Sequence, residues 1–282
     1  MQTQPLTDQI ANISPLYVVL IVTFFTIVRI ALAKSEQSWA HSISETCDTI
    51  NFVLILAFLL VRPFIAQAFY IPSASMRQTL LEKDRLIVDK LSYRAHEPRR
   101  HDVVVFNAPP EATDEGVDGI DFIKRLIGLP GDTIEVKAAS IKIGNEAIDT
   151  KPQAIQDYLK GKLDLNATDD WIKLFPDYLL IDGKTRMTKV ELAAKLGRTG
   201  ETVVITPGQT LVNRQVQNEP YTREDPGYDY GPVRIQDGQL FMLGDNRNQS
   251  RDSHVWGPLD RGRIVGRAAV VFWPPLRMGT IR

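Results

Sequence analysis

The stretch FIKRLIGLPGDTIEV, residues Phe122–Val136, indicates the fold class of the larger part of this chain. Its last four residues, Thr133–Val136, alternate polar and apolar side chains and are rich in β-branched types, which is typical of a strand. Gly128, Pro130 and Gly131 precede them and favour a turn. Runs of the same kind lie on both sides: RLIVD (Arg85–Asp89), VVVF (Val103–Phe106), TVVI (Thr202–Ile205), QLFML (Gln239–Leu243) and IVGRAAVVFW (Ile264–Trp273). Short strands at this spacing predict a mainly β domain built of antiparallel sheets.

Residues from about 138 to 200 interrupt this pattern with helical spacing. The segments that show it are PQAIQDYLKGKL and KVELAAKLG, and in the second one Val190, Ala193 and Ala194 can share a helix face. We therefore predict a helical insertion in the β domain, acting as a structural cap or surface excursion without chemistry of its own.

Two long apolar stretches occupy the first seventy residues. After an N-terminal tail (1–15), residues 16–33 read LYVVLIVTFFTIVRIALA, with Arg29 as the only charge. An apolar helix of about 20 residues spans a bilayer, so this pattern predicts a first transmembrane helix. A cleaved signal peptide is the alternative, but the tail lacks Lys and Arg and a second apolar stretch follows, which favours an uncleaved span.

The second stretch, Ile50–Ile71, has a charge-free run that ends at Val61, before Arg62 and Pro63. We predict a second transmembrane helix over residues 50–68 that ends near 62–64, followed by FIAQAFYIP in extended form along the membrane surface. A buried core helix is the alternative interpretation.

The basic residues at the end of the first stretch set the expected topology. Because the tail has none, while Arg29 and Lys34 follow the first span, residues 34–49 are predicted to form a short cytoplasmic loop. Residues 69–282 then form an extracytoplasmic catalytic domain. The lone cysteine, Cys47, falls on or near the reducing side.

Composition excludes several classes of function. A formal net charge of −1 gives no basic excess for nucleic acid. A single cysteine excludes an internal disulfide, and four histidines without CxxC or HExxH spacing give no metal motif. No cofactor is indicated, so any chemistry must come from other side chains.

Three segments hold residue types suited to catalysis: IPSASM (Ile71–Met76), FIKRLIGLPGD (Phe122–Asp132) and MLGDNRNQSRDSHVWG (Met242–Gly257). A serine after an apolar run is more often a cap or turn residue than a nucleophile. Lys124 has apolar neighbours, and burial lowers a lysine's pKa so that it can deprotonate a serine. The alternative is a lysine that extends from a strand edge into solvent.

The third segment can form a local hydrogen-bond network in which Ser250, Asp252 or Ser253 orients an amine, or it can be only a well-satisfied loop. No spacing in the sequence brings Ser75, Lys124 and Ser250 together. The residues alone therefore make a Ser–Lys pair possible without predicting it.

These segments resemble, in order, the sequence boxes of the bacterial type I signal peptidases, also called leader peptidases. The resemblance runs from the second apolar stretch to the last strand through IPSASM, KDRLIVDKLSY, IKRLIGLPGD and GDNRNQSRDSHVWG, and leaves the insertion uncovered. Five boxes in family order are far more specific than one serine or one lysine.

The resemblance implies a role for each matching residue. Ser75 is the expected nucleophile and Lys124 its general base. Ser73 is expected to join the Ser75 backbone N–H in the oxyanion hole. Ser250 is expected to hydrogen-bond and position the lysine, and Asp252 to support it. Asp245, Asn246 and Arg247 look structural. Shallow apolar pockets for small side chains are expected at Phe69, Ile71, Pro72, Met76, Leu80, Phe122 and Ile123.

The expected protein is a multi-pass enzyme of the bacterial inner membrane that contacts lipid and removes signal peptides from secreted preproteins after an Ala-x-Ala-like site. No metal, organic cofactor or nucleic acid takes part. Two alternatives stay open: a noncatalytic membrane-anchored β domain that binds envelope proteins, and a specialised peptidase for one pilus or conjugation precursor.

Three residues depart from the family pattern. Gln78 stands where proline is usual, Lys83 where glycine is usual, and His254 where arginine is more frequent. Gln78 is expected to loosen the local turn, and neither of the first two changes touches a proton-transfer group. The third is expected to weaken an ion pair with Asp252 or to make it depend on pH.

Overall fold

The computed structural model describes residues 15–33, 35, 37–114, 116–148, 158–165 and 170–281. The chain divides into two compact units. The first consists of Met1–Tyr70, Lys83–Glu97 and Gly266–Ile281, and the second of Ile71–Glu82, Pro98–Val265 and Arg282.

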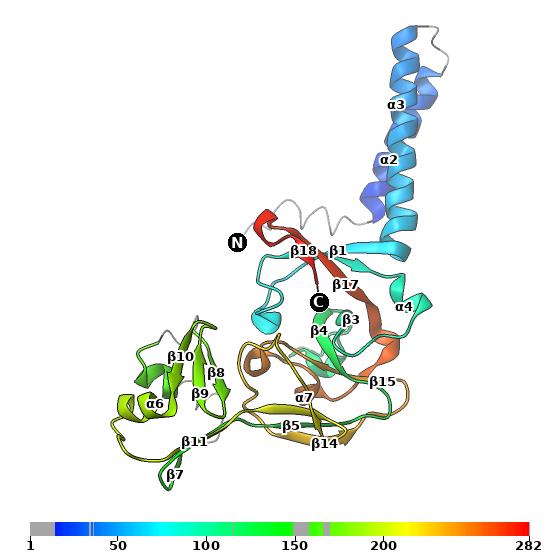
Figure 1. The fold of residues 1–282 in the computed structure, drawn as a ribbon. Coiled ribbons are helices and arrows are strands. Elements are labelled where there is room, and N and C mark those ends of the chain that lie inside the picture. The colour runs from blue at the N-terminus through cyan, green and yellow to red at the C-terminus, as the bar shows by residue number, and fades with distance from the viewer. Residues whose placement is uncertain are drawn as a thin grey trace. The chain divides into compact units, whose positions relative to one another are not determined.

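The first unit begins with two packed helices, α2 (Pro15–Leu32) and α3 (Ser38–Ile55), which Figure 1 shows side by side. Arg29 Nε lies 2.7 Å from Asp48 Oδ1, and Asn51 Nδ2 donates to Thr26 Oγ1 at 3.1 Å, so polar contacts join the two helices. Both apolar stretches are helical, as expected.

The boundaries of the second helix differ from the expected ones. It begins at Ser38, inside the segment predicted as a loop, because Ala40 and Cys47 recur at helical spacing and are buried. The backbone also stays helical past Pro63, through the π-type segment η1 (Leu56–Ile65). The extended segment therefore starts at Ala66 rather than at Phe64.

In the part of the chain that the structure describes, no helix is both long enough and apolar enough to cross a membrane. The two predicted spans are not confirmed.

The rest of the first unit is an antiparallel sheet. Strand β1 (Ala66–Tyr70) pairs with β2 (Arg85–Asp89), β2 with β17 (Ile264–Trp273), and β17 with β18 (Gly279–Thr280). The predicted strands RLIVD and IVGRAAVVFW are confirmed with their expected bounds. Short helical segments complete the unit: α4 (Ser92–Ala95) and η6 (Pro275–Arg277).

Two antiparallel sheets form the body of the second unit. One has the strand order β3 (Val103–Asn107), β4 (Asp121–Gly128), β15 (Gln239–Leu243), β16 (Leu259–Asp260). The other has the order β13 (Gln215–Val216), β12 (Gln209–Val212), β5 (Thr133–Lys137), β14 (Tyr230–Arg234). Their shared core includes Ile127, Ile134, Val136, Val212, Ile235, Phe241 and Leu243. The predicted antiparallel β class is thus confirmed.

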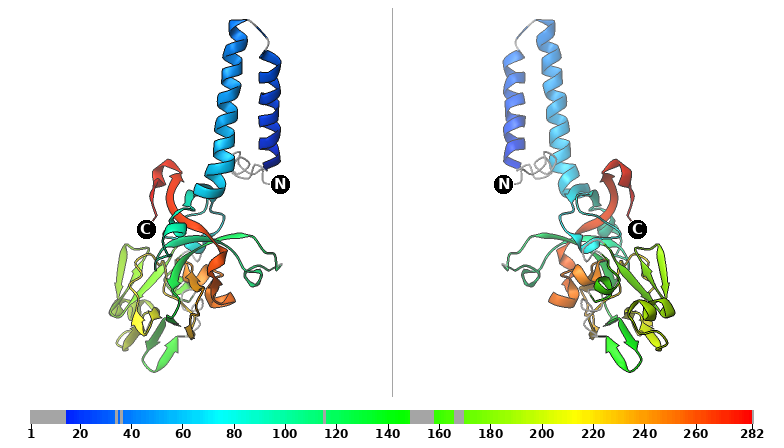
Figure 2. Two further views of the ribbon diagram at one scale, coloured as in Figure 1. Left: turned by 90° about the vertical axis from the view of Figure 1, so that its right-hand side faces the viewer. Right: turned by 90° about the vertical axis from the view of Figure 1, so that its left-hand side faces the viewer.

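Short helical segments lie in the loops of this unit. They are η2 (Ala74–Met76), η3 (Pro110–Ala112), η4 (Arg247–Gln249), α7 (Ser253–Trp256) and η5 (Arg261–Arg263). The connection between β3 and β4 projects from the sheet in the two side views of Figure 2. Two of the segments, η2 and η4, contact each other. This contact joins residues Ile71–Met76, the serine segment, to the polar loop that follows β15.

The insertion is only partly helical, which corrects the sequence prediction. Besides α6 (Lys189–Lys195) and a helical turn at 158–162, it contains β6 (Ser140–Ile143) and β7 (Glu146–Ile148), and β11 (Val203–Thr206), just past its predicted end, pairs with β6. A three-stranded meander, β8 (Ile172–Phe175), β9 (Tyr178–Ile181) and β10 (Thr185–Thr188), completes it. The first half of PQAIQDYLKGKL lies outside the described residues.

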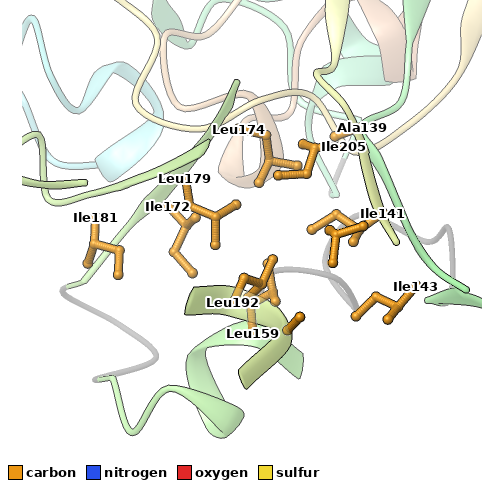
Figure 3. Close-up of a cluster of buried hydrophobic side chains, with 12 residues drawn as sticks. Ala139, Ile141, Ile143, Leu159, Ile172, Leu174, Leu179, Ile181, Leu192 and Ile205 are labelled. Carbon is orange, nitrogen blue, oxygen red and sulfur yellow. The ribbon is translucent and has the colours of Figure 1, made fainter. Parts of the chain in front are cut away.

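Alternating apolar residues and tight turns explain the meander. Leu174 and Leu179 alternate with polar or half-buried neighbours across a two-residue connection, a pattern of period two that favours a hairpin over a helix. The buried side chains of all these elements meet in one apolar cluster, shown in Figure 3. The insertion therefore has a core of its own.

Candidate active site

Two neighbouring elements of the second unit carry the predicted catalytic residues. Ser75 lies on η2, and Lys124 lies on β4, opposite Val104 of β3. Both side chains are buried, Ser75 at 7% exposure and Lys124 at 4%. Strand β4 also contacts η2 directly, so the tertiary fold joins residues 49 positions apart.

The lysine amine and the serine hydroxyl are in hydrogen-bond contact. Lys124 Nζ donates to Ser75 Oγ at 2.8 Å and to the Ile123 carbonyl at 3.0 Å. The same nitrogen lies 5.2 Å from the centre of the Phe122 ring. A distance of 2.8 Å suits proton transfer in either direction along this bond.

Burial lowers the pKa of Lys124 from 10.5 to about 8. The negative charges of Asp252 and Asp245 act in the opposite direction and keep the pKa from falling further. A useful fraction of the amine is therefore neutral slightly above neutral pH and can accept a proton.

Ser73 lies at the exposed side of the pair. Its Oγ is 3.4 Å from Ser75 Oγ, and the residue is exposed. This position is compatible with the expected oxyanion-hole role.

Ser250 lies next to Gly244, close to the Ser75 backbone, but its predicted hydrogen bond to Lys124 is not observed. Its Oγ is buried and has no hydrogen-bond partner among the described residues. The space around it is tight: a Cβ added to Gly244 would lie 2.5 Å from Ser250 Cβ and 2.6 Å from the Ser75 carbonyl oxygen. Gly244 is therefore required by close approach, since any side chain would displace one of these serines.

Asp252 organises the loop that holds Ser250. One carboxylate oxygen accepts the Gly244 N–H at 2.8 Å, and the other is 2.6 Å from His254 Nδ1. His254 in turn stacks on Tyr228, with ring centres 3.9 Å apart. The histidine that replaces the usual arginine thus keeps a direct contact with the aspartate.

The two residues after Gly244 anchor the serine segment. Asp245 forms a buried two-pronged ion pair with Arg125, at 2.8 and 2.7 Å, and also contacts Thr79. Asn246 donates its N–H to the Ser75 carbonyl at 3.0 Å and its side-chain amide to the Ala74 carbonyl at 3.1 Å. These contacts agree with the structural roles expected for this part of the loop.

The side chains that bind the charged residues of this loop were not predicted from the sequence. Arg125 also lies 3.9 Å from the centre of the Tyr221 ring, and Arg247 forms an ion pair with Glu219 at 2.6 Å. Charged residues within otherwise apolar segments, such as Arg125 in β4, suggest buried ion pairs. The sequence spacing does not indicate which acidic residue pairs with which basic one.

The residues of the predicted substrate pockets occupy different environments. Ile71, Met76 and Leu80 are fully buried, Phe122 and Ile123 are half-buried, and Pro72 is exposed. Phe69 belongs to the other unit and is half-buried there. The assignment of these residues to pockets stays a prediction.

Backbone geometry explains two departures from the family pattern. Lys83 has φ of 74°, in the left-handed region that glycine adopts without strain. Gln78 has φ of 98°, which the ring of a proline forbids. The turn after Ser75 therefore differs from one that contains proline.

Among the described residues, no group of three or more His, Cys, Asp or Glu side chains is placed to hold a metal ion.

A serine hydroxyl held against a buried lysine amine in an antiparallel β domain is typical of a serine hydrolase with an amine as its base. The chain matches the family model described as signal peptidase, peptidase S26, over residues 43–177 and 196–273, and it belongs to this family. The resemblance predicted from the sequence is confirmed, and the match also includes part of the insertion.

Named relatives agree with this family. The chain is 33% identical to probable signal peptidase I-2 of Synechocystis sp., covering 90% of this chain and 84% of the relative. It is 33% identical to signal peptidase I of Leptolyngbya laminosa, covering 88% and 89%. A crystal structure of a signal peptidase I from Enterococcus faecalis V583 is 21% identical and covers 61% of this chain and 97% of that one, with a TM-score of 0.25, too low to bear on the fold.

We expect Lys124→Met to raise the free energy of unfolding at pH 7 while abolishing hydrolase activity. Below pH 8 the folded protein carries a protonated, desolvated lysine, and this cost disappears as the pH rises from about 8 to 10.5. The gain is up to about 3 kcal/mol at pH 7 and near zero at pH 10.5. Denaturant unfolding in detergent at both pH values measures it, with exposed Lys142→Met as the control. If the gain in the free energy of unfolding is the same at both pH values, the lowered pKa of the buried Lys124 is contradicted.

We expect Gly244→Ala to reduce activity by roughly 100-fold, because the new methyl group displaces Ser250 or the Ser75 carbonyl. Gly279→Ala is the matched control, since a Cβ there meets nothing within 4 Å. Turnover of the two purified variants under identical conditions is the measurement. Equal activity shows that the site tolerates this displacement.

Proposed function

We propose that this protein is a signal-peptide-cleaving serine endopeptidase in which Ser75 is the nucleophile and Lys124 the general base. The observation that carries the proposal is the 2.8 Å contact between a buried amine with a pKa of about 8 and the Ser75 hydroxyl. Membership of the signal peptidase family and relatives named signal peptidase I support the same activity.

The proposed reaction has two acyl-transfer steps. Neutral Lys124 accepts the Ser75 hydroxyl proton as Oγ attacks the scissile carbonyl, and the resulting ammonium gives the proton to the leaving amine. Lys124, neutral again, then deprotonates a water molecule that attacks the Ser75 ester, and it returns this proton to Ser75 Oγ as the acyl group leaves.

The oxyanion hole is proposed to consist of the Ser75 backbone N–H and the Ser73 hydroxyl. Loss of one such donor raises the barrier by about 3 kcal/mol. Ser250 is proposed to orient the Lys124 amine once substrate is bound, because its buried hydroxyl has no partner among the described residues of the substrate-free protein. Asp252 holds the loop in place through the Gly244 N–H.

The proposed substrates are secreted preproteins with small residues at the first and third positions before the cleaved bond. Ile71, Met76 and Leu80, close to Ser75 in the chain, are apolar and fully buried, and apolar surroundings of this kind suit small apolar side chains such as alanine. An Ala-x-Ala pattern is typical of the end of a signal peptide.

We further propose that α2 and the helix from Ser38 to Ile65 hold the enzyme in the bacterial inner membrane as two passes, with the catalytic domain on the extracytoplasmic side. Large apolar side chains remain exposed along α2, including Phe24 at 60% and Ile27 at 61%. Exposure of so much apolar surface to water is unfavourable, so these helices favour contact with lipid.

Cleavage of a purified precursor with an Ala-x-Ala site tests the activity. We expect the unmodified protein to cut after the final alanine, and Ser75→Ala and Lys124→Ala to lose at least about 1,000-fold in kcat. Activity should rise with pH through about 8, because only the neutral form of Lys124 accepts a proton. Equal cutting by all three proteins removes the support for Ser75 and Lys124 as the catalytic pair, and no cutting by any of them favours the noncatalytic binding alternative.

Carbonate extraction of membranes tests the anchor. We expect the unmodified protein to stay in the pellet, and Phe24→Lys combined with Ile27→Lys to enter the soluble fraction in large part, because each lysine opposes insertion into lipid. Val190→Lys is the control, since Val190 is 76% exposed in the insertion and far along the chain from the helices. An unmodified protein found entirely in the soluble fraction contradicts membrane anchoring.

A further inference from the structure

The insertion is attached to the segment at 219–227, and that segment in turn holds the loop that carries Ser250. The insertion core in Figure 3 contains Leu159, from the helical turn at 158–162, and Leu174, from β8. Both are at most 1% exposed. The residues next to them in the chain, Lys160 and Lys173, send their amines out of this core towards the segment at 219–227.

The first attachment is a buried ion pair. Lys160 Nζ lies 3.0 Å from Glu224 Oε1, and the two side chains are only 6% and 9% exposed. A buried pair of this kind is held in one geometry, because loss of either partner leaves an uncompensated charge away from water.

The second attachment is made by residues of β8. Lys173 Nζ donates to Thr222 Oγ1 at 3.0 Å and to the Thr222 carbonyl at 3.2 Å. The N–H of Leu174 donates to Asp225 Oδ2 at 2.6 Å. The segment at 219–227 is thus fixed to the insertion at several points, all within the second unit.

Asn248 connects this segment to the active-site loop. Its side-chain amide donates to Glu224 Oε2 at 3.3 Å and to the Asp225 carbonyl at 3.0 Å, and its side-chain oxygen accepts the Gly227 N–H at 2.9 Å. Asn248 lies midway between Asn246, which holds the Ser75 carbonyl, and Ser250. Glu224 therefore contacts the insertion with one carboxylate oxygen and the active-site loop with the other.

We propose that the insertion is a positioning element of the active site, which acts through Lys160 and Glu224 on Asn248 and so fixes the loop that carries Asn246 and Ser250. Lys160, Glu224 and Asn248 touch no reacting atom in this arrangement. They are positioning residues, and the inference about their effect on turnover rests on the proposed peptidase activity.

The proposal predicts a loss of turnover without a loss of substrate binding. Lys160→Met leaves the Glu224 carboxylate buried without its cation and loosens its contact with Asn248. We expect kcat to fall roughly 10- to 100-fold, because small displacements of positioned groups have effects of this size. KM should stay within about twofold. Asn248→Ala should give the same pattern, whereas Lys160→Arg, which keeps the charge, should recover most of the rate.

Arg198→Met is the matched control. Arg198 also lies in the insertion, but its ion pairs are with Glu146, at 2.9 Å, and with Glu201 rather than with the segment at 219–227, and its side chain is 35% exposed. Full-length variants purified in detergent are compared for kcat, KM, melting temperature and cleavage of the Ala-x-Ala precursor. We expect Arg198→Met to keep the unmodified kcat even where it lowers the melting temperature.

Amide hydrogen exchange over residues 244–252 gives a readout that does not depend on cleavage. We expect faster exchange there in Lys160→Met and Asn248→Ala, and unmodified exchange in Arg198→Met and Lys160→Arg. Unchanged kcat and exchange in Lys160→Met, or equal changes in the Arg198→Met control, overturns the proposal. If the unmodified protein does not cleave, the proposed function fails, and the exchange data alone decide whether the insertion positions the loop.

Discussion

Burial of the Lys124 amine against the Ser75 hydroxyl is the constraint on which the rest of the site depends. A protonated lysine cannot act as a base, and an exposed lysine stays protonated at neutral pH. The fold lowers the pKa to about 8 by placing Lys124 on β4, beneath η2 and beside Phe122. This arrangement costs folding free energy, so the proposed Ser75–Lys124 pair needs strong support from its surroundings.

The loop that follows β15 supplies much of that support. Its backbone comes so close to the serine segment that only glycine fits at position 244, and the next two residues bind Arg125 and the carbonyls around Ser75. Asp252 has a double effect, because its carboxylate fixes Gly244 and its charge raises the pKa of Lys124 against the effect of burial. Position and basicity of the catalytic groups therefore depend on the same loop.

The insertion adds a further layer to this arrangement. It folds around its own apolar core, and its buried contacts lead through Glu224 to Asn248, inside the active-site loop. An element expected to be a cap without chemistry is thus linked, through Glu224, to a residue two positions before Ser250. In the proposed arrangement, the packed core of the insertion restrains this polar loop through these buried contacts.

The sequence by itself determined the β class, the positions of six strands (β2, β3, β5, β11, β15 and β17), the helical character of the apolar stretches, and the family. These follow from local alternation, from apolar content and from five ordered boxes, all of which are written along one stretch of chain. It missed the meander of the insertion, because KVELAAKLG and PQAIQDYLKGKL drew attention to helices while IKLF and YLLI are short. Only the tertiary structure decided which polar groups meet: Lys124 with Ser75, Asp245 with Arg125 and Lys160 with Glu224. The physical reason is that burial and pairing depend on strands and loops far apart in the chain, and no residue spacing records their contact.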